Sequence, residues 1–215
     1  MVLSDWTFEN PARILANLKR YGGYYNFQRR TLANLPEEAS RSGFWQALGD
    51  RLTWARMRMD STDLADVTGV TYTYLINGLG AQENWTGLFS PGERVRLRFI
   101  NASAATYFDV RIPGLAMEVI QADGMNVASV EVDEFRLAVA ETLDVLVTPT
   151  ELAHTIFAEA MDRSGFARAT LSTQTGLAAD LPARRPRPLL TMQDTLAETS
   201  PWRCAESSET CRWKH

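Results

Sequence analysis

The feature that most constrains the fold is an alternation of apolar and polar residues with a period of two, which begins at about Thr71 and continues to Leu171. Successive side chains of a β-strand point to opposite faces, so this pattern predicts strands with one face on a core. Turn motifs separate the runs: Asn77-Gly78, Pro91-Gly92, Pro113-Gly114, Asp123-Gly124, Pro149 and Ser164-Gly165. Short strands with frequent turns predict a mainly β fold, a sandwich or barrel.

The clearest run places Val95, Leu97 and Phe99 on one face of a strand. The other face carries three arginines: Arg94, Arg96 and Arg98. This cationic face is either solvated or receives an acidic neighbouring domain through electrostatic complementarity. A second run alternates Phe108, Val110 and Ile112 with Tyr107, Asp109 and Arg111. Its polar residues are expected on the face away from the core.

Residues 1–8 form a short β-like segment. Residues 11–62, which follow it, lack the alternation with a period of two and predict a helical insertion after the first strand. Pro11 suits a first helical position, and Gly22-Gly23 ends the first helix. Apolar residues then recur at spacings of three and four: Phe44, Leu48, Leu52, Ala55 and Met59. That spacing predicts a helix with one buried stripe.

The residue pattern changes again near the C-terminus. The segment from Pro182 to Pro188 holds three prolines and three arginines, and proline cannot join a sheet interior. The final residues show neither period. We therefore expect one domain at residues 1–178, followed at 179–215 by a linker and an atypical, disordered tail.

Composition excludes several functions. The chain has 215 residues and a net charge of −4, which disfavours a nucleic-acid partner because phosphate binding needs clustered positive charge. No stretch approaches the ~20 apolar residues of a membrane span. The chain contains two histidines, His154 and His215, and two cysteines, Cys204 and Cys211. This scarcity excludes a metal site built mainly from imidazole and thiolate.

Several strands and their turns carry recognisable motifs, which lie at residues 3–6, 74–78 (YLING), 91–101 (PGERVRLRFIN), 119–124 (VIQADG) and 140–147 (AETLDVLV). Two more specific motifs lie at residues 57–69 of the insertion and at residues 160–165 (AMDRSG). Together these segments resemble the second, middle cupredoxin domain of copper-resistance protein A-type multicopper oxidases. The resemblance covers residues 2–192 and implies a cupredoxin-like Greek-key β-sandwich or barrel.

The resemblance implies a parent that couples copper-dependent oxidation to oxygen reduction and confers copper tolerance. Family members bind copper through His-x-His and His-Cys-His motifs in their first and third domains, and none of these motifs occurs here. No copper ligand is carried over, so we expect no catalytic residue and no cofactor in this chain, and copper only in the parent. The implied role of a middle domain is structural, with the neighbouring cupredoxin domains as partners.

Two other interpretations stay open. The chain could be a subunit that completes an oxidase with separate partner domains. It could also be a copper carrier that uses Met57 and Met59, because thioether sulfur suits Cu(I), although methionine commonly fills core gaps. His154 is expected to be a strand histidine with a local hydrogen bond. Cys204 and Cys211 either pair with each other, bind a metal with His215, or have no such role.

The parent family implies a periplasmic location. The N-terminus, however, has neither a basic region nor an apolar core, so we expect no signal peptide and a cytoplasmic location for the chain as it stands. A middle domain without its neighbours exposes the faces that they cover, and exposed apolar patches favour association. We therefore also expect self-association.

Overall fold

The structure is a computed structural model that describes residues 1–190, 202–203 and 212–213. It divides into two compact units. The first comprises residues 1–29 and 63–188, and the second comprises residues 30–62 together with the chain from residue 189 onward. The described part of the chain contains no helix that is long and apolar enough to cross a membrane.

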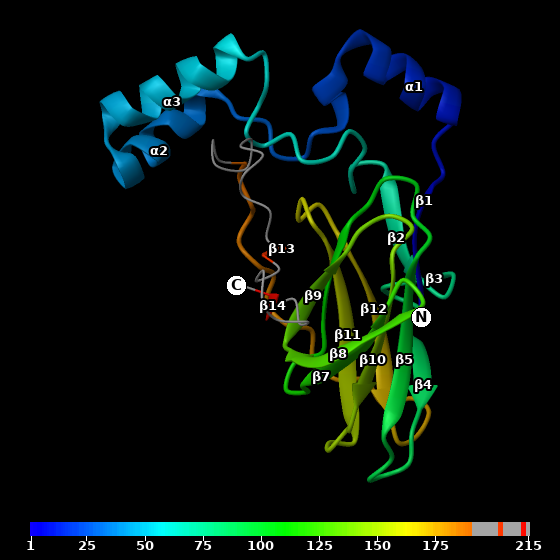
Figure 1. Cartoon of the computed structure of the whole chain (residues 1–215). Coiled ribbons are helices and arrows are strands. Elements are labelled where there is room, and N and C mark those ends of the chain that lie inside the picture. The colour runs from blue at the N-terminus through cyan, green and yellow to red at the C-terminus, as the bar shows by residue number, and fades with distance from the viewer. Residues whose placement is uncertain (191–201, 204–211, 214–215) are drawn as a thin grey trace. The chain divides into compact units, whose positions relative to one another are not determined.

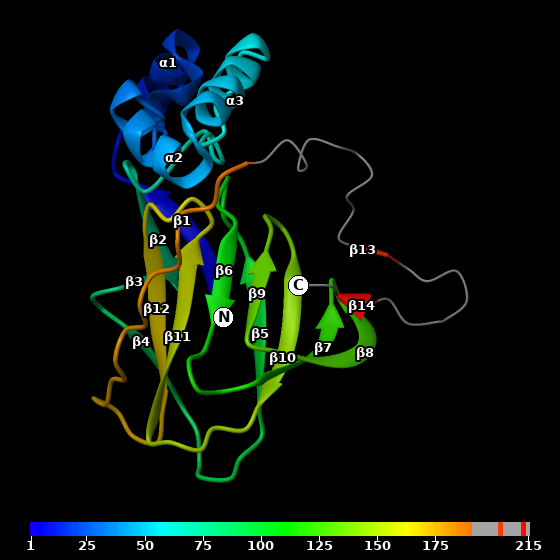
Figure 2. The same ribbon diagram turned by 90° about the vertical axis from the view of Figure 1, so that its left-hand side faces the viewer.

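The first unit is a sandwich of two sheets (Figures 1 and 2). Sheet A has the order β3-β2-β1-β5-β10-β7-β8, and sheet B has the order β4-β12-β11-β6-β9. Neighbouring strands are antiparallel except for the pairs β1–β5 and β4–β12, which are parallel. The strands of sheet A are β1 (Val2–Thr7), β2 (Tyr72–Ile76), β3 (Leu79–Gly80), β5 (Val95–Asn101), β7 (Met117–Ala122), β8 (Met125–Val132) and β10 (Thr142–Val147). Those of sheet B are β4 (Trp85–Leu88), β6 (Phe108–Arg111), β9 (Glu134–Leu137), β11 (Ala153–Ala160) and β12 (Phe166–Ser172).

The core lies between the two sheets and is built from the inward residues of the predicted strands. Leu97 and Phe99 of β5 are buried there, while Arg96 and Arg98 are exposed, as the alternation predicts. Phe99 packs edge-on against Phe135 of the facing sheet, with ring centroids 5.2 Å apart. The prediction of a mainly β fold is therefore confirmed.

Two of the predicted turn motifs form tight hairpins. Asn77 and Gly78 join β2 to β3, and Asp123 and Gly124 join β7 to β8. All four residues have positive φ, between 47° and 80°. Two consecutive residues with positive φ match the right-handed twist of paired strands, which is why Asn-Gly and Asp-Gly are preferred there.

The first unit also contains helix α1 (Pro11–Arg20) and the 3-10 turn η1 (Gly22–Tyr25). The side chain of Asn10 accepts a hydrogen bond from the Ala12 amide at 2.9 Å and caps the helix. Ile14 packs with Tyr25 and Val67 in a small second core. These contacts attach α1 to the β-sandwich unit.

The second unit contains the 3-10 turn η2 (Leu32–Asn34), α2 (Leu35–Ser42) and α3 (Phe44–Arg56). The short strands β13 (Trp202–Arg203) and β14 (Arg212–Trp213) pair with each other. Glu38 of α2 receives hydrogen bonds from Arg51 of α3 and from Arg30, at 2.7–2.9 Å. These ion pairs attach α2 and the preceding segment to α3.

The predicted buried stripe of α3 is wrong. The helix buries Ala47 and Trp54, whereas Phe44, Leu52 and Met59 are half exposed. Arg51 lies between Ala47 and Trp54 in the sequence and shares their face of the helix, and its ion pair with Glu38 brings α2 to that face. Periodicity identifies an apolar stripe, but it cannot show which face a neighbouring helix covers.

Candidate functional site: a buried ion network under residues 179–188

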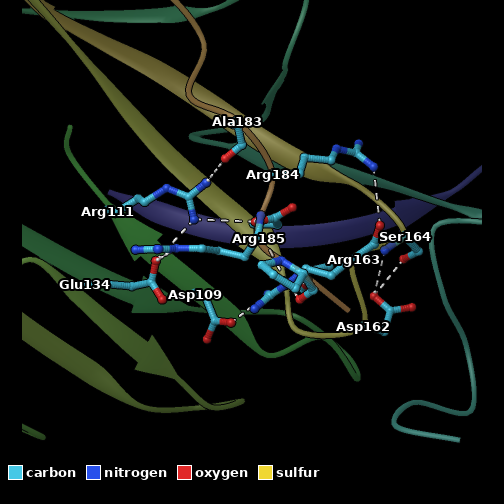
Figure 3. Close-up of polar contacts among 12 residues, drawn as sticks. Asp109, Arg111, Glu134, Asp162, Arg163, Ser164, Ala183, Arg184 and Arg185 are labelled. Carbon is cyan, nitrogen blue, oxygen red and sulfur yellow. Dashed lines mark hydrogen bonds and ion pairs between the residues drawn. The ribbon is translucent and has the colours of Figure 1, made fainter. Parts of the chain in front are cut away.

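The outer face of sheet B carries charged residues in matched cross-strand pairs, of which Figure 3 shows Arg111 with Glu134. Arg136 of β9 stands opposite Asp109 of β6 and contacts both of its carboxylate oxygens, at 2.7 and 3.0 Å. Arg111 of β6 stands opposite Glu134 of β9, at 3.1 Å. Opposite charges placed directly across antiparallel strands stabilise the pairing.

Two carboxylates meet at the centre of this face. Asp109 and Glu159 are register partners on β6 and β11, and both are buried. Arg163, from the turn after β11, donates to Asp109 at 2.6 Å and lies 4.0 Å from Glu159, which Arg111 also contacts at 3.5 Å. Burial alone would raise the pKa of Asp109, but the hydrogen bonds and charges of Arg136 and Arg163 outweigh it and hold that pKa below its usual value.

Residues 179–188, here called the strap, cover this network. The Ala183 carbonyl accepts from Arg111 at 2.6 Å, and the Arg185 amide donates to Glu159 at 3.2 Å. The Pro186 carbonyl accepts from Arg163 at 3.3 Å. A cavity of about 640 Å³ remains beside the strap, lined by its residues 182–186, by residues 111–116 and by Asp133.

The motif at residues 160–165 forms the turn between β11 and β12. Its Ser164 hydroxyl lies 2.8 Å from the Tyr74 hydroxyl and accepts from the Gly69 amide at 2.7 Å. Burial raises the pKa of Tyr74, so that its hydroxyl stays protonated and can donate. The turn therefore joins β2, the segment around Gly69 and, through Arg163, the ion network.

The arginines on the cationic face of β5, and Arg94 just before it, form ion pairs with acidic residues of the same chain. Arg96 and Arg98 contact the buried carboxylate of Asp144 at 2.5 and 3.0 Å, and Arg94 contacts Glu118. The arginines thus have acidic partners within the same sheet, on β10 and β7. This arrangement favours the solvated sheet face over a surface for an acidic domain.

The described residues do not fit a copper site. His154 lies buried in β11, and its Nε2 accepts from the Glu151 amide at 3.2 Å, which is the local hydrogen bond expected from the sequence. No three His, Cys, Asp or Glu side chains gather in a metal-binding arrangement within the described part of the chain. Cys204, Cys211 and His215 lie outside the described residues.

Met57 and Met59 directly follow α3. Their exposed fractions are 37% and 51%, so both side chains are accessible to a solute. Their role as sulfur ligands remains a prediction.

Sequence reasoning missed the ion network. Asp109 and Arg111 lie on the outer face of sheet B, as their alternation with apolar residues indicates, but nothing in that alternation predicts that this face is covered and that both residues are buried. The partners that bury them lie far along the chain, at Arg163 and in the strap. Two features of the sequence could have indicated the network. One is a strand in which charged residues alternate with apolar ones, and the other is a downstream segment rich in arginine and proline.

Comparison with known proteins finds a matching family model and similar sequences. A family model described as multicopper oxidase matches residues 45–178. Copper resistance protein A from Escherichia coli is 57% identical over 194 residues, and that from Pseudomonas syringae pv. tomato is 54% identical. Each match covers 90% of this chain and 32% of the relative, so the chain spans about a third of the length of these curated relatives.

Solved structures show the same fold at low sequence identity. Fet3p, a multicopper oxidase that functions in iron import, has a TM-score of 0.53 at 15% identity, over 86% of this chain and 29% of Fet3p. A laccase from Botrytis aclada has a TM-score of 0.50 at 13% identity, over 87% and 30% of the two chains. The fold is cupredoxin-like, and the chain belongs to the multicopper oxidase family.

Proposed function

We propose that this chain is the middle cupredoxin domain of a copper-resistance multicopper oxidase, and that its role is structural. The similarity to copper resistance protein A over 90% of the chain supports the assignment to this type of oxidase. The coverage of 32% of that relative supports the presence of further domains in the parent. The proposed partners are the neighbouring cupredoxin domains.

The observation that carries the proposal is the shortage of copper ligands. An oxidase that reduces oxygen needs several imidazoles and a thiolate, whereas the whole chain has two histidines and two cysteines. The described histidine, His154, already accepts a backbone hydrogen bond. The chain by itself is therefore expected to be catalytically silent.

A complementation experiment tests this role. The chain is assayed for oxidase activity alone and after co-expression with the parts of the E. coli relative that its match does not cover. We expect no turnover alone and restored turnover in the mixture, which would also support a subunit that completes an oxidase. Oxygen turnover by the chain alone would refute the silent role, and no gain on co-expression would refute the partnership.

A Met-based copper carrier is the second candidate, favoured by the exposure of Met57 and Met59. Thioethers bind Cu(I) well, and both side chains are accessible. Titration with Cu(I) should then show a site that is lost in the Met57→Leu, Met59→Leu double variant. Met125, which is also exposed, provides the matched Met125→Leu control. Equal binding by the wild type and the double variant would rule out this pair as the site.

The remaining assignments follow from the same proposal. The domain would occupy residues 1–178, with its helical insertion at residues 11–62, and residues 179–215 would be a linker and a disordered, atypical tail, most of which lies outside the described residues. The parent would act in the periplasm. Fractionation of cells that express the parent tests this location, and recovery of the parent in the cytoplasm would contradict it.

A further inference from the structure

The strap is composed as a linker, yet its polar groups are bonded to sheet B. Thr155 donates to the Ala179 carbonyl at 3.0 Å, and Arg111 donates to the Ala183 carbonyl. The Arg185 side chain contacts Glu134 at 3.1 Å. Figure 3 shows Ala183 and Arg185 near Arg111 and Glu134, whereas Arg184 extends toward Arg163. Proline has no amide hydrogen, so the strap cannot form the regular backbone hydrogen bonds of a strand. Side chains of the sheet bind its carbonyl groups instead.

Aromatic contacts add to this attachment. The Arg184 guanidinium lies 5.1 Å from the Phe166 ring centroid and donates to the Arg163 carbonyl at 3.3 Å. The Arg187 guanidinium lies 4.9 Å from the ring centroid of Phe27. Arginine over an aromatic face is attractive, most of all where water is partly excluded. Each arginine of the strap thus has a partner in the first unit.

Glu159 lies at the centre of these contacts and is fully buried. Its Oε2 atom accepts from the strap at the Arg185 amide and lies near Arg111 and Arg163. Its Oε1 atom is buried without a hydrogen-bond partner in the described structure. An unsatisfied buried carboxylate oxygen costs free energy, and water could reach it if the strap moved away. The contacts of the Glu159 Oε2 atom therefore favour the closed strap, whereas the unpaired Oε1 atom favours an open one.

We propose that residues 179–188 act as a latch that opens and closes as a unit on sheet B, with Glu159 as its anchor. Closed, the latch fixes the place where the chain leaves sheet B; open, it exposes the Asp109–Glu159 network to water. This inference does not depend on the proposed function, because it concerns contacts within the first unit alone.

Trypsin offers a direct measure of latch opening. It cleaves after arginine but not before proline, so Arg184–Arg185 is the susceptible bond among the three arginines of the strap. In the closed latch the Arg185 amide, which is part of this bond, donates to Glu159, and the carbonyl of the preceding peptide, that of Ala183, accepts from Arg111. A protease must free these groups, so the cleavage rate reports the open population when reclosing is fast.

The first test compares the whole chain with a peptide of residues 177–190, with cleavage at Arg184–Arg185 followed by mass spectrometry. We expect the bond in the folded chain to be cleaved at least about tenfold more slowly than in the peptide. Cleavage at Arg168–Ala169, within β12, serves as the internal reporter of global unfolding. Equal rates for chain and peptide would overturn the latch.

The second test weakens the anchor. Glu159→Gln removes the charge that the Arg185 amide and two guanidinium groups face, and should speed cleavage at Arg184–Arg185 by about tenfold more than it speeds cleavage at Arg168–Ala169, the reporter of global unfolding. If that variant fails to fold, Glu134→Gln, at a less buried site that contacts Arg185, replaces it. An unchanged rate at Arg184–Arg185 relative to Arg168–Ala169 in folded Glu159→Gln would refute the anchor, and an unchanged rate in Glu134→Gln would refute a latch held by the ion pairs of Arg185.

A matched pair of threonines completes the design. Thr155 and Thr170 are register partners on β11 and β12, and both are buried. Thr155 donates to the strap, whereas Thr170 contacts Asn84. Thr155→Val should speed cleavage about fivefold and Thr170→Val should not, since a neutral hydrogen bond contributes about 1 kcal/mol net. Equal effects of the two substitutions would contradict a latch held by these contacts.

Discussion

Gly165 shows how closely a single residue can be constrained by its neighbours. A Cβ atom at this position would lie 2.6 Å from Cε2 of Tyr74. The ring cannot easily move, because it packs edge-on against Phe108 and its hydroxyl contacts Ser164. Glycine therefore allows the turn at residues 160–165 to lie directly against β2.

Gly165→Ala should lower the free energy of unfolding by about 1–3 kcal/mol, the usual cost of overpacking a core. Chemical denaturation measures the change. Gly22→Ala is the matched control in the same unit, since no atom lies within 4 Å of its added Cβ. A Gly165 variant as stable as the Gly22 variant would contradict the close approach.

Asp109 is the residue whose charge matters most to the ion network. Asp109→Asn leaves Arg163 buried without its carboxylate partner, and should cost about 3–5 kcal/mol of stability at neutral pH. The folded pKa of Asp109 lies below its unfolded value of 3.8, so its stabilising contribution is present above that pH. The contribution is lost as the pH falls through the folded pKa.

The stability difference between wild type and Asp109→Asn should therefore shrink below pH 3.8, as followed by denaturation at several pH values. Glu118→Gln, which breaks an exposed pair with Arg94, should cost less than about 1 kcal/mol and serves as the control. A gap that stays constant down to low pH would contradict the role of the carboxylate charge.

At the scale of elements, the α2–α3 pair depends on Glu38. Hydrogen bonds from Arg30 oppose the effect of burial and, with those from Arg51, lower the pKa of Glu38 to about 2. The carboxylate stabilises the unit above pH 4.5, and this effect is lost as the pH falls from 4.5 towards 2.

Glu38→Gln should raise amide exchange of residues 44–56 by about tenfold at neutral pH, because charge-assisted hydrogen bonds are lost. Glu37→Gln, at an exposed pair with Arg41 in the same helix, is the control and should have little effect. Equal exchange in the two variants would refute the role of Glu38.

Strand β8 is the long edge strand of sheet A, with one described neighbour, β7. Met125 and Val127 are exposed along it, and an exposed apolar edge can pair with another chain. We therefore expect the chain to self-associate through this edge. Val127→Lys should then reduce association in sedimentation experiments. A wild-type chain that stays monomeric at high concentration would contradict the prediction.

The sequence predicted the elements better than it predicted their surroundings. Local alternation was sufficient for β5, where Leu97 and Phe99 are buried and the alternating Arg96 and Arg98 are exposed. It was insufficient for β6, whose four residues are all buried because the strap covers the outer face. It also failed for α3, where the ion pair of Glu38 and Arg51 selects the covered face. Local patterns contain no information on contacts between segments distant in sequence.

At the scale of the whole molecule, a cupredoxin-like sandwich of the multicopper oxidase family is combined with a sequence that has few copper ligands. Ion pairs and hydrogen bonds engage Asp109, Glu134 and Glu159 of the described network and the described histidine. These interactions stabilise the fold, and they support the structural role that we propose for the chain.

Copper stoichiometry of the purified chain tests this claim most directly. After loading with copper and removal of loosely bound ions, elemental analysis and visible absorption are measured on the same sample. The account predicts far less than one copper per chain and no intense blue thiolate-to-copper absorption. One tightly bound copper with that absorption, accompanied by consumption of oxygen, would contradict it.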